Sequence, residues 1–293
     1  MHPAPSLILF TVLSGLGFGL LVWLGFGLSA PLGARAFILF GLGYGLAGAG
    51  LIAAAFHLGH PERALKAFSQ WRSSWLSREA VLSVATLLAL APHAAASTFW
   101  GTPLPVLGWI GAMLALATIF ATAMIYAQIK AVPRWHHAST PPVFLLAALG
   151  GGALLAGLAT IALWAMLALA FAIVFHWVAG DRQFRASGTD TGTATGLGSV
   201  GRVRLLEPPH SGQNYLLREM VYVVGRKHAR KLRLIALGLG AFLPALLLIL
   251  PVSYISLALA LLSHTAGMFV QRWLFFAQAE HVVGLYYGSR GQD

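Results

Sequence analysis

Two ionisable side chains flank a polar stretch that separates two long apolar segments near the start of the chain. The stretch covers residues 57–79 and reads HLGHPERALKAFSQWRSSWLSRE, with His57 at its beginning and Glu79 at its end. An imidazole has an unperturbed pKa of about 6.5 and can pass protons near neutral pH, and a carboxylate can exchange protons with water. Held at the mouth of a helical bundle, this pair could carry out proton-coupled chemistry at a membrane surface.

A quinone is one substrate for such chemistry. It needs hydrogen-bond partners for two carbonyl oxygens, a proton donor or acceptor near each, and an apolar slot for its ring and tail. His57 and Glu79 would meet these needs together with Arg272, which lies about one turn before the end of the last apolar segment. In the alternative interpretation His57 caps its segment and Glu79 forms the first turn of the next one, paired with Arg78 or Arg63. The residues alone leave both interpretations open.

Two further histidines, His93 and His264, lie deep within apolar segments. Their depths differ by about two helical turns or less, so a haem b could be held between them. Alternatively, each imidazole hydrogen-bonds to a neighbouring backbone or hydroxyl group, such as that of Ser263 or Thr265. Intramembrane histidines have many uses, and we favour a quinone site over a haem.

The elements that must position these residues are membrane-spanning helices. Of the 293 residues, 58% are hydrophobic and 9% are charged, whereas a soluble domain has about 25% charged residues. The sequence has no cysteine, which excludes iron–sulfur clusters and thiolate metal sites in this chain, and we expect no metal site. In so apolar a chain, the formal charge of +11 indicates membrane topology and contact with anionic lipid rather than nucleic acid.

A membrane-spanning helix needs about 20 mostly apolar residues. This rule predicts an all-α bundle of eight helices, with spans near 7–27, 37–57, 80–98, 108–128, 143–159, 162–180, 234–252 and 254–277. The fifth and sixth are difficult to separate because 143–180 is one apolar run, in which Gly150–Gly152 and Gly157–Thr160 are the candidate bends. The many glycines of the first two spans predict that those helices pack closely.

The distribution of Lys and Arg predicts the orientation. With eight spans both termini lie on one face, and every one of the 19 basic residues except Arg35 lies on that face. The positive-inside rule therefore places this face and both termini in the cytoplasm. The chain then divides into helices 1–6 at 1–180, with the loop 58–79; a basic cytoplasmic loop at 181–233; and helices 7 and 8 with a tail at 234–293. Residues 214–233 have the pattern of an amphipathic helix, and the whole loop is large enough to dock a soluble subunit.

The chain resembles the membrane-anchor subunits of the dimethyl sulfoxide reductase family of quinone-linked molybdenum enzymes. The matching residues are His57-Leu58-Gly59, Pro61, Arg63-Ala64, Leu76-Ser77-x-Glu79, Val132-Pro133-x-Trp135, Thr140-Pro141 and Arg272 with Phe275 and Phe276. The resemblance implies an anchor that binds quinone near the first block. It also implies two partners outside this chain, an iron–sulfur subunit and a catalytic subunit with molybdopterin. His57 and Glu79 would then serve quinol binding and proton handling, with Arg63, Trp135 and Arg272 as further cofactor-binding candidates.

The predicted orientation discriminates within this family. Dimethyl sulfoxide reductase anchors hold their catalytic subunits outside the cytoplasmic membrane, whereas here the face with His57 is the basic, cytoplasmic one. The chain is therefore more similar to the anchor of the cytoplasmic quinone-linked sulfite dehydrogenases. That resemblance implies that partner subunits oxidise sulfite and pass electrons to ubiquinone or menaquinone in a bacterial inner membrane. The alternatives are a haem b-binding electron-transfer subunit, a quinol-oxidising anchor, a transporter and a purely structural anchor.

Overall fold

The computed structural model describes residues 2–57, 60–204, 206–207 and 228–287, and within these ranges all regular structure is helical. Seven helices in these described ranges are long and apolar enough to cross a membrane. They are α1 (Pro5–Gly25), α2 (Gly33–Ala55), α3 (Trp75–Ala95) with η2 (Ala96–Trp100), α4 (Pro105–Ala127), α6 (Ala159–Ala186), α10 (Ala229–Leu237) with η3 (Gly238–Phe242) and α11 (Leu243–Ile249), and α12 (Tyr254–Ala277). An eighth apolar helix, α5 (Thr140–Leu155), is shorter. Short helical pieces outside this set are η1 (Pro61–Phe68), α7 (Thr191–Thr195) and η4 (Val282–Tyr287).

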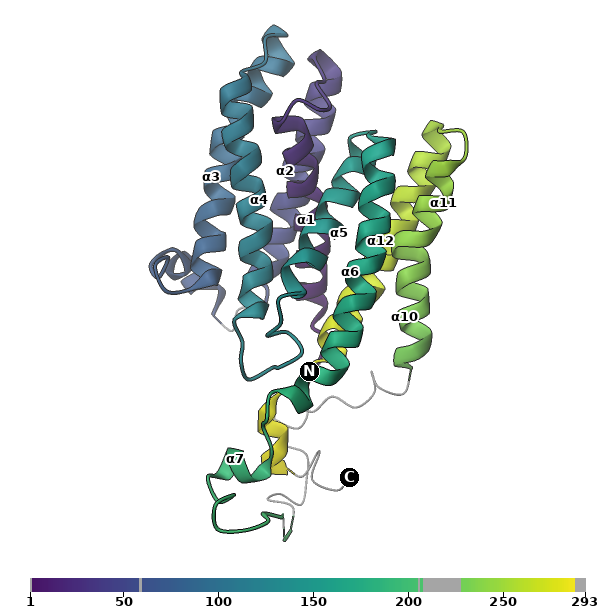
Figure 1. The fold of residues 1–293 in the computed structure, drawn as a ribbon. Helices are drawn as coiled ribbons and strands as arrows, with labels where there is room; N and C mark the ends of the chain where they lie inside the picture. The colour runs from purple at the N-terminus through teal and green to yellow at the C-terminus, as the bar shows by residue number, and fades with distance from the viewer. Residues whose placement is uncertain (1, 58–59, 205, 208–227, 288–293) are drawn as a thin grey trace.

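The long helices pack side by side in one bundle with α1 inside it (Figure 1). Helix α1 contacts α2, α4, α5 and α12, and 72% of its apolar stretch is buried, against 28% for α2. A helix that is apolar on every side is expected in such a central position. Helices α3 and α4 pack together on one flank, and α6, α10, α11 and α12 form the other.

Glycines let α1 lie directly against two of its neighbours. A Cβ atom at Gly17 would overlap the backbone nitrogen of Ala47 on α2, and one at Gly19 would overlap the carbonyl oxygen of Ala148 on α5. The backbones therefore touch without intervening side chains, as small residues allow in membrane helices. The expected close packing of the first two helices is confirmed. Not every glycine of α2 takes part, because a Cβ at Gly45 would meet no atom within 4 Å.

The boundary between α5 and α6 lies at the second of the two candidate bends. Helix α5 ends at Leu155, and Gly157 adopts a φ of +75° in the turn before α6 begins at Ala159. The first candidate, Gly150–Gly152, lies inside α5, so the expectation of a bend there is wrong. A Cβ at Gly152 would overlap the backbone of Gly19, which means that the triplet serves helix packing.

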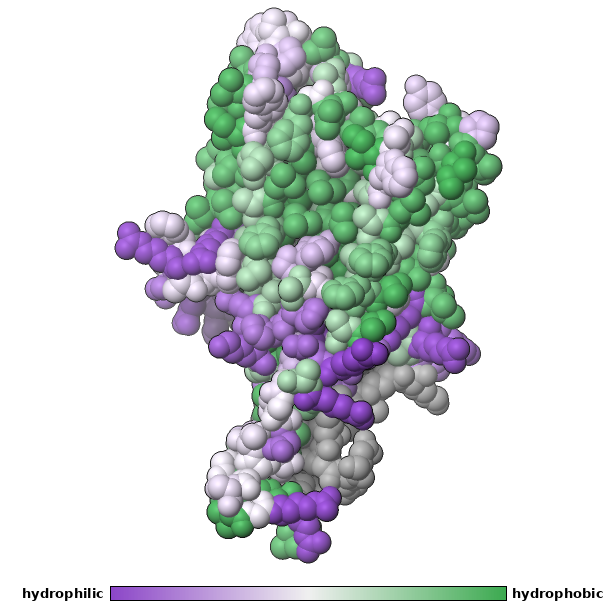
Figure 2. Space-filling model, viewed as in Figure 1, coloured by the Kyte–Doolittle hydropathy of each residue, from purple (hydrophilic) through white to green (hydrophobic). Residues whose placement is uncertain are grey.

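The start of α1 and the end of α12 lie at the same end of the bundle, the lower end in Figure 1. Hydrophilic side chains gather at this end, beneath a broad apolar band (Figure 2). Because the exposed Arg63, Arg182, Arg185 and Arg230 lie on the segments there, we call it the basic end. Helix α6 continues to Ala186 and α10 begins at Ala229, so both ends of the expected loop 181–233 are helical. Most of the expected amphipathic helix at 214–233 falls on residues 208–227, which lie outside the described residues.

Candidate functional site

The carboxyl group of Glu79 lies inside the bundle near its basic end. Glu79 occupies the second turn of α3 and is 4% exposed. Its Oε1 accepts a hydrogen bond of 2.5 Å from Thr122 Oγ1 on α4. Within the described residues no cation pairs with Glu79, and Arg78 donates instead to the backbone oxygens of Trp71 and Arg72. The surface ion pair considered for Glu79 is therefore not formed with Arg78.

The hydroxyl group of Thr122 can serve Glu79 in either protonation state. Thr122 Oγ1 lies 3.1 Å from the carbonyl oxygen of Thr118 as well as 2.5 Å from Glu79, but a hydroxyl has only one hydrogen to donate. When Glu79 is ionised, Thr122 donates to it. When Glu79 is protonated, its O–H can donate to Thr122 Oγ1 while Thr122 turns its own hydrogen to Thr118. This arrangement suits a carboxyl group that gains and loses a proton.

A second buried ionisable group, Arg272, faces the same interior from α12. Arg272 is 2% exposed, and its guanidinium carbon lies 3.6 Å from the ring centroid of Phe144 on α5. Tyr126 on α4 packs against the same Phe144, with ring centroids 5.7 Å apart. Arg272 Nη1 is buried with no hydrogen-bond partner within the described part of the chain. Because buried donors in native proteins are nearly always paired, the two N–H groups of Nη1 are the donors that a ligand in this interior would satisfy.

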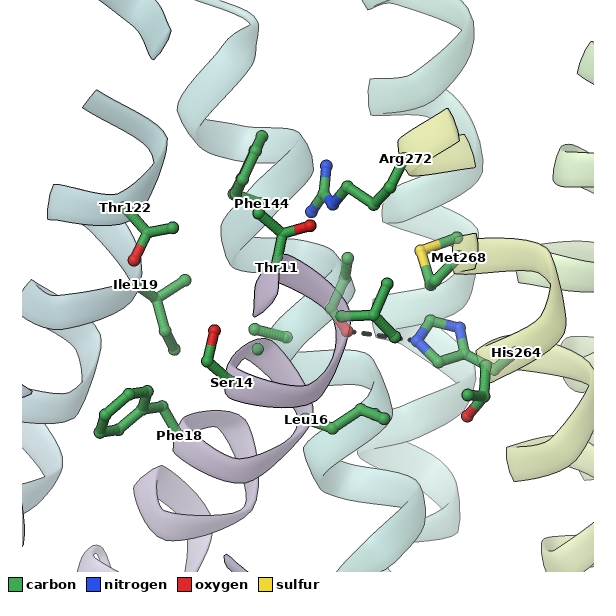
Figure 3. A pocket seen from close by; sticks show the side chains of 15 residues that line it. Thr11, Ser14, Leu16, Phe18, Ile119, Thr122, Phe144, His264, Met268 and Arg272 are labelled. Atoms are coloured by element: carbon green, nitrogen blue, oxygen red, sulfur yellow. Dashed lines mark hydrogen bonds between the residues drawn. The ribbon is translucent and has the colours of Figure 1, made fainter. Parts of the chain in front are cut away.

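A cavity lies between these groups, with Thr122 and Arg272 on opposite sides of it (Figure 3). Helices α1, α4, α5 and α12 line it with Thr11, Val12, Ser14, Gly15, Leu16, Phe18, Ile119, Thr122, Phe144, Ala147, Ala148, His264, Thr265, Met268 and Arg272. Its free volume is about 20 Å³, which is room for about one water molecule. An aromatic ring could enter only if lining side chains moved, and the unbranched Met268 is the one that adapts most readily.

His57 and Arg63 lie outside this cavity. His57 is exposed just after α2, where its Nδ1 lies 3.5 Å from Ser6 Oγ at the start of α1. Arg63 is exposed on η1. Residues 58–59 between them are outside the described ranges. The structure therefore brings His57 and Glu79 to the same end of the bundle, one at the surface and one inside, without a contact between them.

Trp135 packs within the protein and makes no contact with the cavity. Its ring stacks on Phe275 with centroids 5.3 Å apart and meets Tyr126 and Phe276 edge-on. Its Nε1 donates a 2.9 Å hydrogen bond to the carbonyl oxygen of Phe275. Because an indole has a single donor, a ligand could contact only the ring of Trp135.

We expect Trp135→Phe to lower the free energy of unfolding by roughly 1–3 kcal/mol, because it leaves the buried carbonyl of Phe275 without its donor. Thermal unfolding of the purified protein in detergent measures this loss. Trp109→Phe is the matched control, since Trp109 is 56% exposed at the opposite end of the bundle. Equal melting temperatures for the two variants would contradict the packing role of Trp135.

The two deep histidines face different cavities. His264 lines the cavity with Arg272, and its Nδ1 and Nε2 lie 2.7 Å and 3.3 Å from the carbonyl oxygens of Gly240 and Ala147. His93 contacts the backbone of Leu104 through Nδ1 and lines a separate cavity of about 180 Å³ at the other end of α3. Each imidazole thus bonds to backbone, as in the alternative interpretation, and their contacts give no support to a haem between them. The described residues contain no group of three His, Asp or Glu side chains that could hold a metal ion.

Sequence reasoning missed Thr122, Tyr126 and Phe144 as parts of the site. A signal was available for the first of these. Thr118 and Thr122 are polar residues four positions apart in an otherwise apolar helix, a spacing that places both on one face. Nothing in the sequence distinguishes Phe144 from the other aromatic residues of the spans.

Comparison with known proteins gives two findings that bear on this site. A family described as DMSO reductase anchor subunit (DmsC) matches residues 1–193, which include Glu79, Thr122 and Tyr126 but not Arg272. A sulfite dehydrogenase subunit from Allochromatium vinosum is 30% identical over 324 aligned residues, covering 99% of this chain and 99% of the relative. No solved structure matches the chain.

Proposed function

Because the chain belongs to the DMSO reductase anchor subunit family, we propose that it is the quinone-reactive subunit of a molybdopterin oxidoreductase complex. It is a multi-pass integral membrane protein of the bacterial inner membrane. In the proposed role it passes electrons between a partner iron–sulfur subunit and membrane quinone. The 293 residues include no cysteine, so the iron–sulfur clusters must belong to a partner.

The observation that carries this proposal is the cavity with an unpaired arginine N–H on one side and a route to a buried carboxyl group on the other. Reduction of a quinone consumes two electrons and two protons. Arg272 can donate a hydrogen bond to a ring carbonyl oxygen and stabilise the negative charge that develops there, an effect that is strong where water is excluded. Glu79 can supply a proton through Thr122, whose hydroxyl both accepts and donates.

In the proposed proton route His57 is the residue at the aqueous surface. Its imidazole is exposed to water, and an imidazole can both accept and donate a proton. Glu79 is the buried residue that exchanges protons with the quinone. Arg63, exposed on η1, adds positive charge to the same end of the bundle. His57 and Glu79, on which the family resemblance depends most, would thus carry the proton one after the other. They would not both contact the quinone ring.

We infer that α5 is the eighth crossing and that the basic end is cytoplasmic. Helix α5 has 16 residues and is about 24 Å long at 1.5 Å per residue, less than the roughly 30 Å of a bilayer core. It packs against α1, α4, α6 and α12, so protein rather than lipid surrounds much of it and a short helix is tolerated. With eight crossings, both ends of the chain lie on the basic side, which the positive-inside rule assigns to the cytoplasm.

The similarity to a sulfite dehydrogenase subunit supports sulfite as the substrate of the partner catalytic subunit. Oxidation of sulfite to sulfate with one water molecule releases two electrons and two protons. In this proposal the electrons pass through the iron–sulfur subunit, docked at the basic end, and reduce quinone to quinol. The quinol then diffuses away within the membrane.

We expect Arg272→Gln to weaken the binding of a quinone analogue by about tenfold or more, because a charge-assisted hydrogen bond contributes roughly 1.5–3 kcal/mol. Titration of the purified complex with a fluorescent analogue that is quenched on binding measures this change. Arg35→Gln is the control, since Arg35 is exposed at the opposite end. Arg272→Lys, which keeps the charge but loses the forked donor, should fall between them. Equal dissociation constants for all four proteins would refute the proposed site.

A further inference from the structure

A second and larger cleft opens at the basic end, where the last turns of α6, helix α10 and the segment after α12 line it. Its volume is about 630 Å³, and its polar lining includes Arg134, Asp181, Arg230, Arg233 and Gln278. It shares no lining residue with the cavity beside Arg272. The cleft is therefore a separate site that the proposed quinone chemistry does not use.

A single carboxylate holds two arginines in place on the floor of the cleft. Asp181 accepts a 2.7 Å hydrogen bond from Arg134 Nη2 and a pair of 2.7 Å and 2.6 Å from Nη1 and Nη2 of Arg233. The guanidinium of Arg233 also lies 5.4 Å from the ring centroid of Trp177. Two cations share one anion, so this trio has a net charge of +1. Asp181 uses two of the five N–H groups of Arg233, and Gln278 Oε1 accepts a third from Nε at 3.4 Å, so two remain.

Arg230 places an exposed cation at the entrance. It lies in the first turn of α10. It forms no hydrogen bond or ion pair within the described residues. Glu280 also lines the cleft; with Asp181 it sets two carboxylates against three arginines, so the cleft as a whole carries a net charge of +1. An anion is therefore favoured, and Arg230 is the side chain that is free to bind it.

The apolar part of the cleft favours a lipid over a soluble anion. Leu234 and Leu237 of α10 line it beside the arginines, and Leu234 is 67% exposed. Hydrophilic side chains give way to the apolar band along the helices at this end (Figure 2). A phospholipid with its phosphate on the arginines and its chains along the leucines satisfies both surfaces, whereas a free anion satisfies only one. Basic pockets between helices at the cytoplasmic side of a membrane suit anionic headgroups for this reason.

We propose that this cleft binds the phosphate group of an anionic glycerophospholipid, with Arg230 as the direct ligand and Arg233 as a second donor held in position by Asp181. The bound lipid connects α6 to α10, two helices that are separated in the chain by residues 187–228. It therefore stabilises the packing of α10, α11 and α12 against the rest of the bundle. The site depends on the charge and shape of the cleft and does not depend on quinone binding.

Native mass spectrometry of the purified complex, after delipidation and titration with phosphatidylglycerol, tests this proposal. We expect Arg230→Gln to weaken retention of one phosphatidylglycerol molecule by about tenfold, as the loss of one charge-assisted hydrogen bond predicts. Arg185→Gln, which removes an exposed arginine at the same end but outside the cleft, should retain lipid like the unaltered complex. Phosphatidylcholine, which has no net charge, should bind all three proteins equally weakly.

Three results would overturn the lipid site. The first is equal retention of phosphatidylglycerol by the Arg230→Gln and unaltered complexes. The second is complete displacement of the lipid by millimolar inorganic phosphate, which would identify a site for a free anion. The third is loss of the partner subunits from Arg230→Gln with lipid retention unchanged, which would identify a protein-docking surface. None of these results bears on quinone binding, so the quinone proposal would stand or fail separately.

Discussion

Glu79→Gln lowers quinone-linked turnover of the assembled complex by about 100-fold or more, because a positioned general acid or base contributes roughly 10²–10⁴ to the rate. The amide has nearly the shape of the carboxyl group and can keep the contact with Thr122, which is 2.5 Å in the native protein. It cannot carry a proton. The variant should therefore fold normally and bind a quinone analogue. Turnover should fall because the amide cannot donate the proton that the quinone takes up when it is reduced.

The measurement is steady-state reduction of a short-chain quinone by the purified complex, supplied with sulfite. Glu62→Gln is the matched control, since Glu62 is exposed and bonded to His60 at 2.8 Å. His57→Gln should reduce turnover less than Glu79→Gln, because water can replace a surface imidazole but not a buried carboxyl group. If Glu79→Gln and His57→Gln both turn over at the unaltered rate, the proposed proton route is wrong.

Gly19→Ala should prevent α1 from seating against α5 and strongly reduce the yield of folded protein. The new methyl group would overlap the carbonyl oxygen of Ala148, and a helix backbone cannot move aside as a flexible side chain can. Overpacking typically costs about 1–3 kcal/mol, and more where backbone must shift. Because α1 and α5 also line the cavity beside Arg272, any folded fraction should bind a quinone analogue more weakly.

Gly45→Ala provides the control on the next helix. Both glycines lie inside apolar helices, but a Cβ at position 45 would meet no atom within 4 Å. Alanine is the better helix former by roughly 0.8–1 kcal/mol, so this variant should melt at the same or a higher temperature. Size-exclusion chromatography and thermal unfolding in detergent compare the two. Equal behaviour of Gly19→Ala and Gly45→Ala would contradict the contact between α1 and α5.

The positions of the helices were predictable because each depends on a local property. A run of about 20 apolar residues indicates a span wherever it occurs, and seven of the expected spans correspond to helices of sufficient length. The fifth was misplaced at its end, because the run at 143–180 offered two glycine-rich stretches as bends. Only contacts could separate them: Gly152 packs on Gly19, and Gly157 forms the turn.

The candidate site was predicted in part. The sequence predicts that His57 and Glu79 lie at the same end of the bundle. His57 falls where the second expected span ends, and Glu79 falls where the third begins. It did not predict that Glu79 is buried and His57 exposed. That difference depends on how α3 is rotated about its axis and on which helix covers it. The contact between Glu79 and Thr122 joins residues 43 positions apart, beyond the reach of any local pattern.

The sequence by itself determined that this chain is an all-helical membrane protein whose cations, Arg35 excepted, fall on one side of the expected spans, because hydrocarbon imposes the length of each span and headgroups attract the charges. The family resemblance came from short motifs at helix ends. Only the tertiary structure decided which polar groups meet. It set Arg272 over Phe144, left one guanidinium nitrogen unpaired beside a cavity, and put two arginines on Asp181 in a separate cleft. The physical reason is that a side chain's partner depends on the rotation and neighbours of its helix, which only packing of the whole bundle establishes.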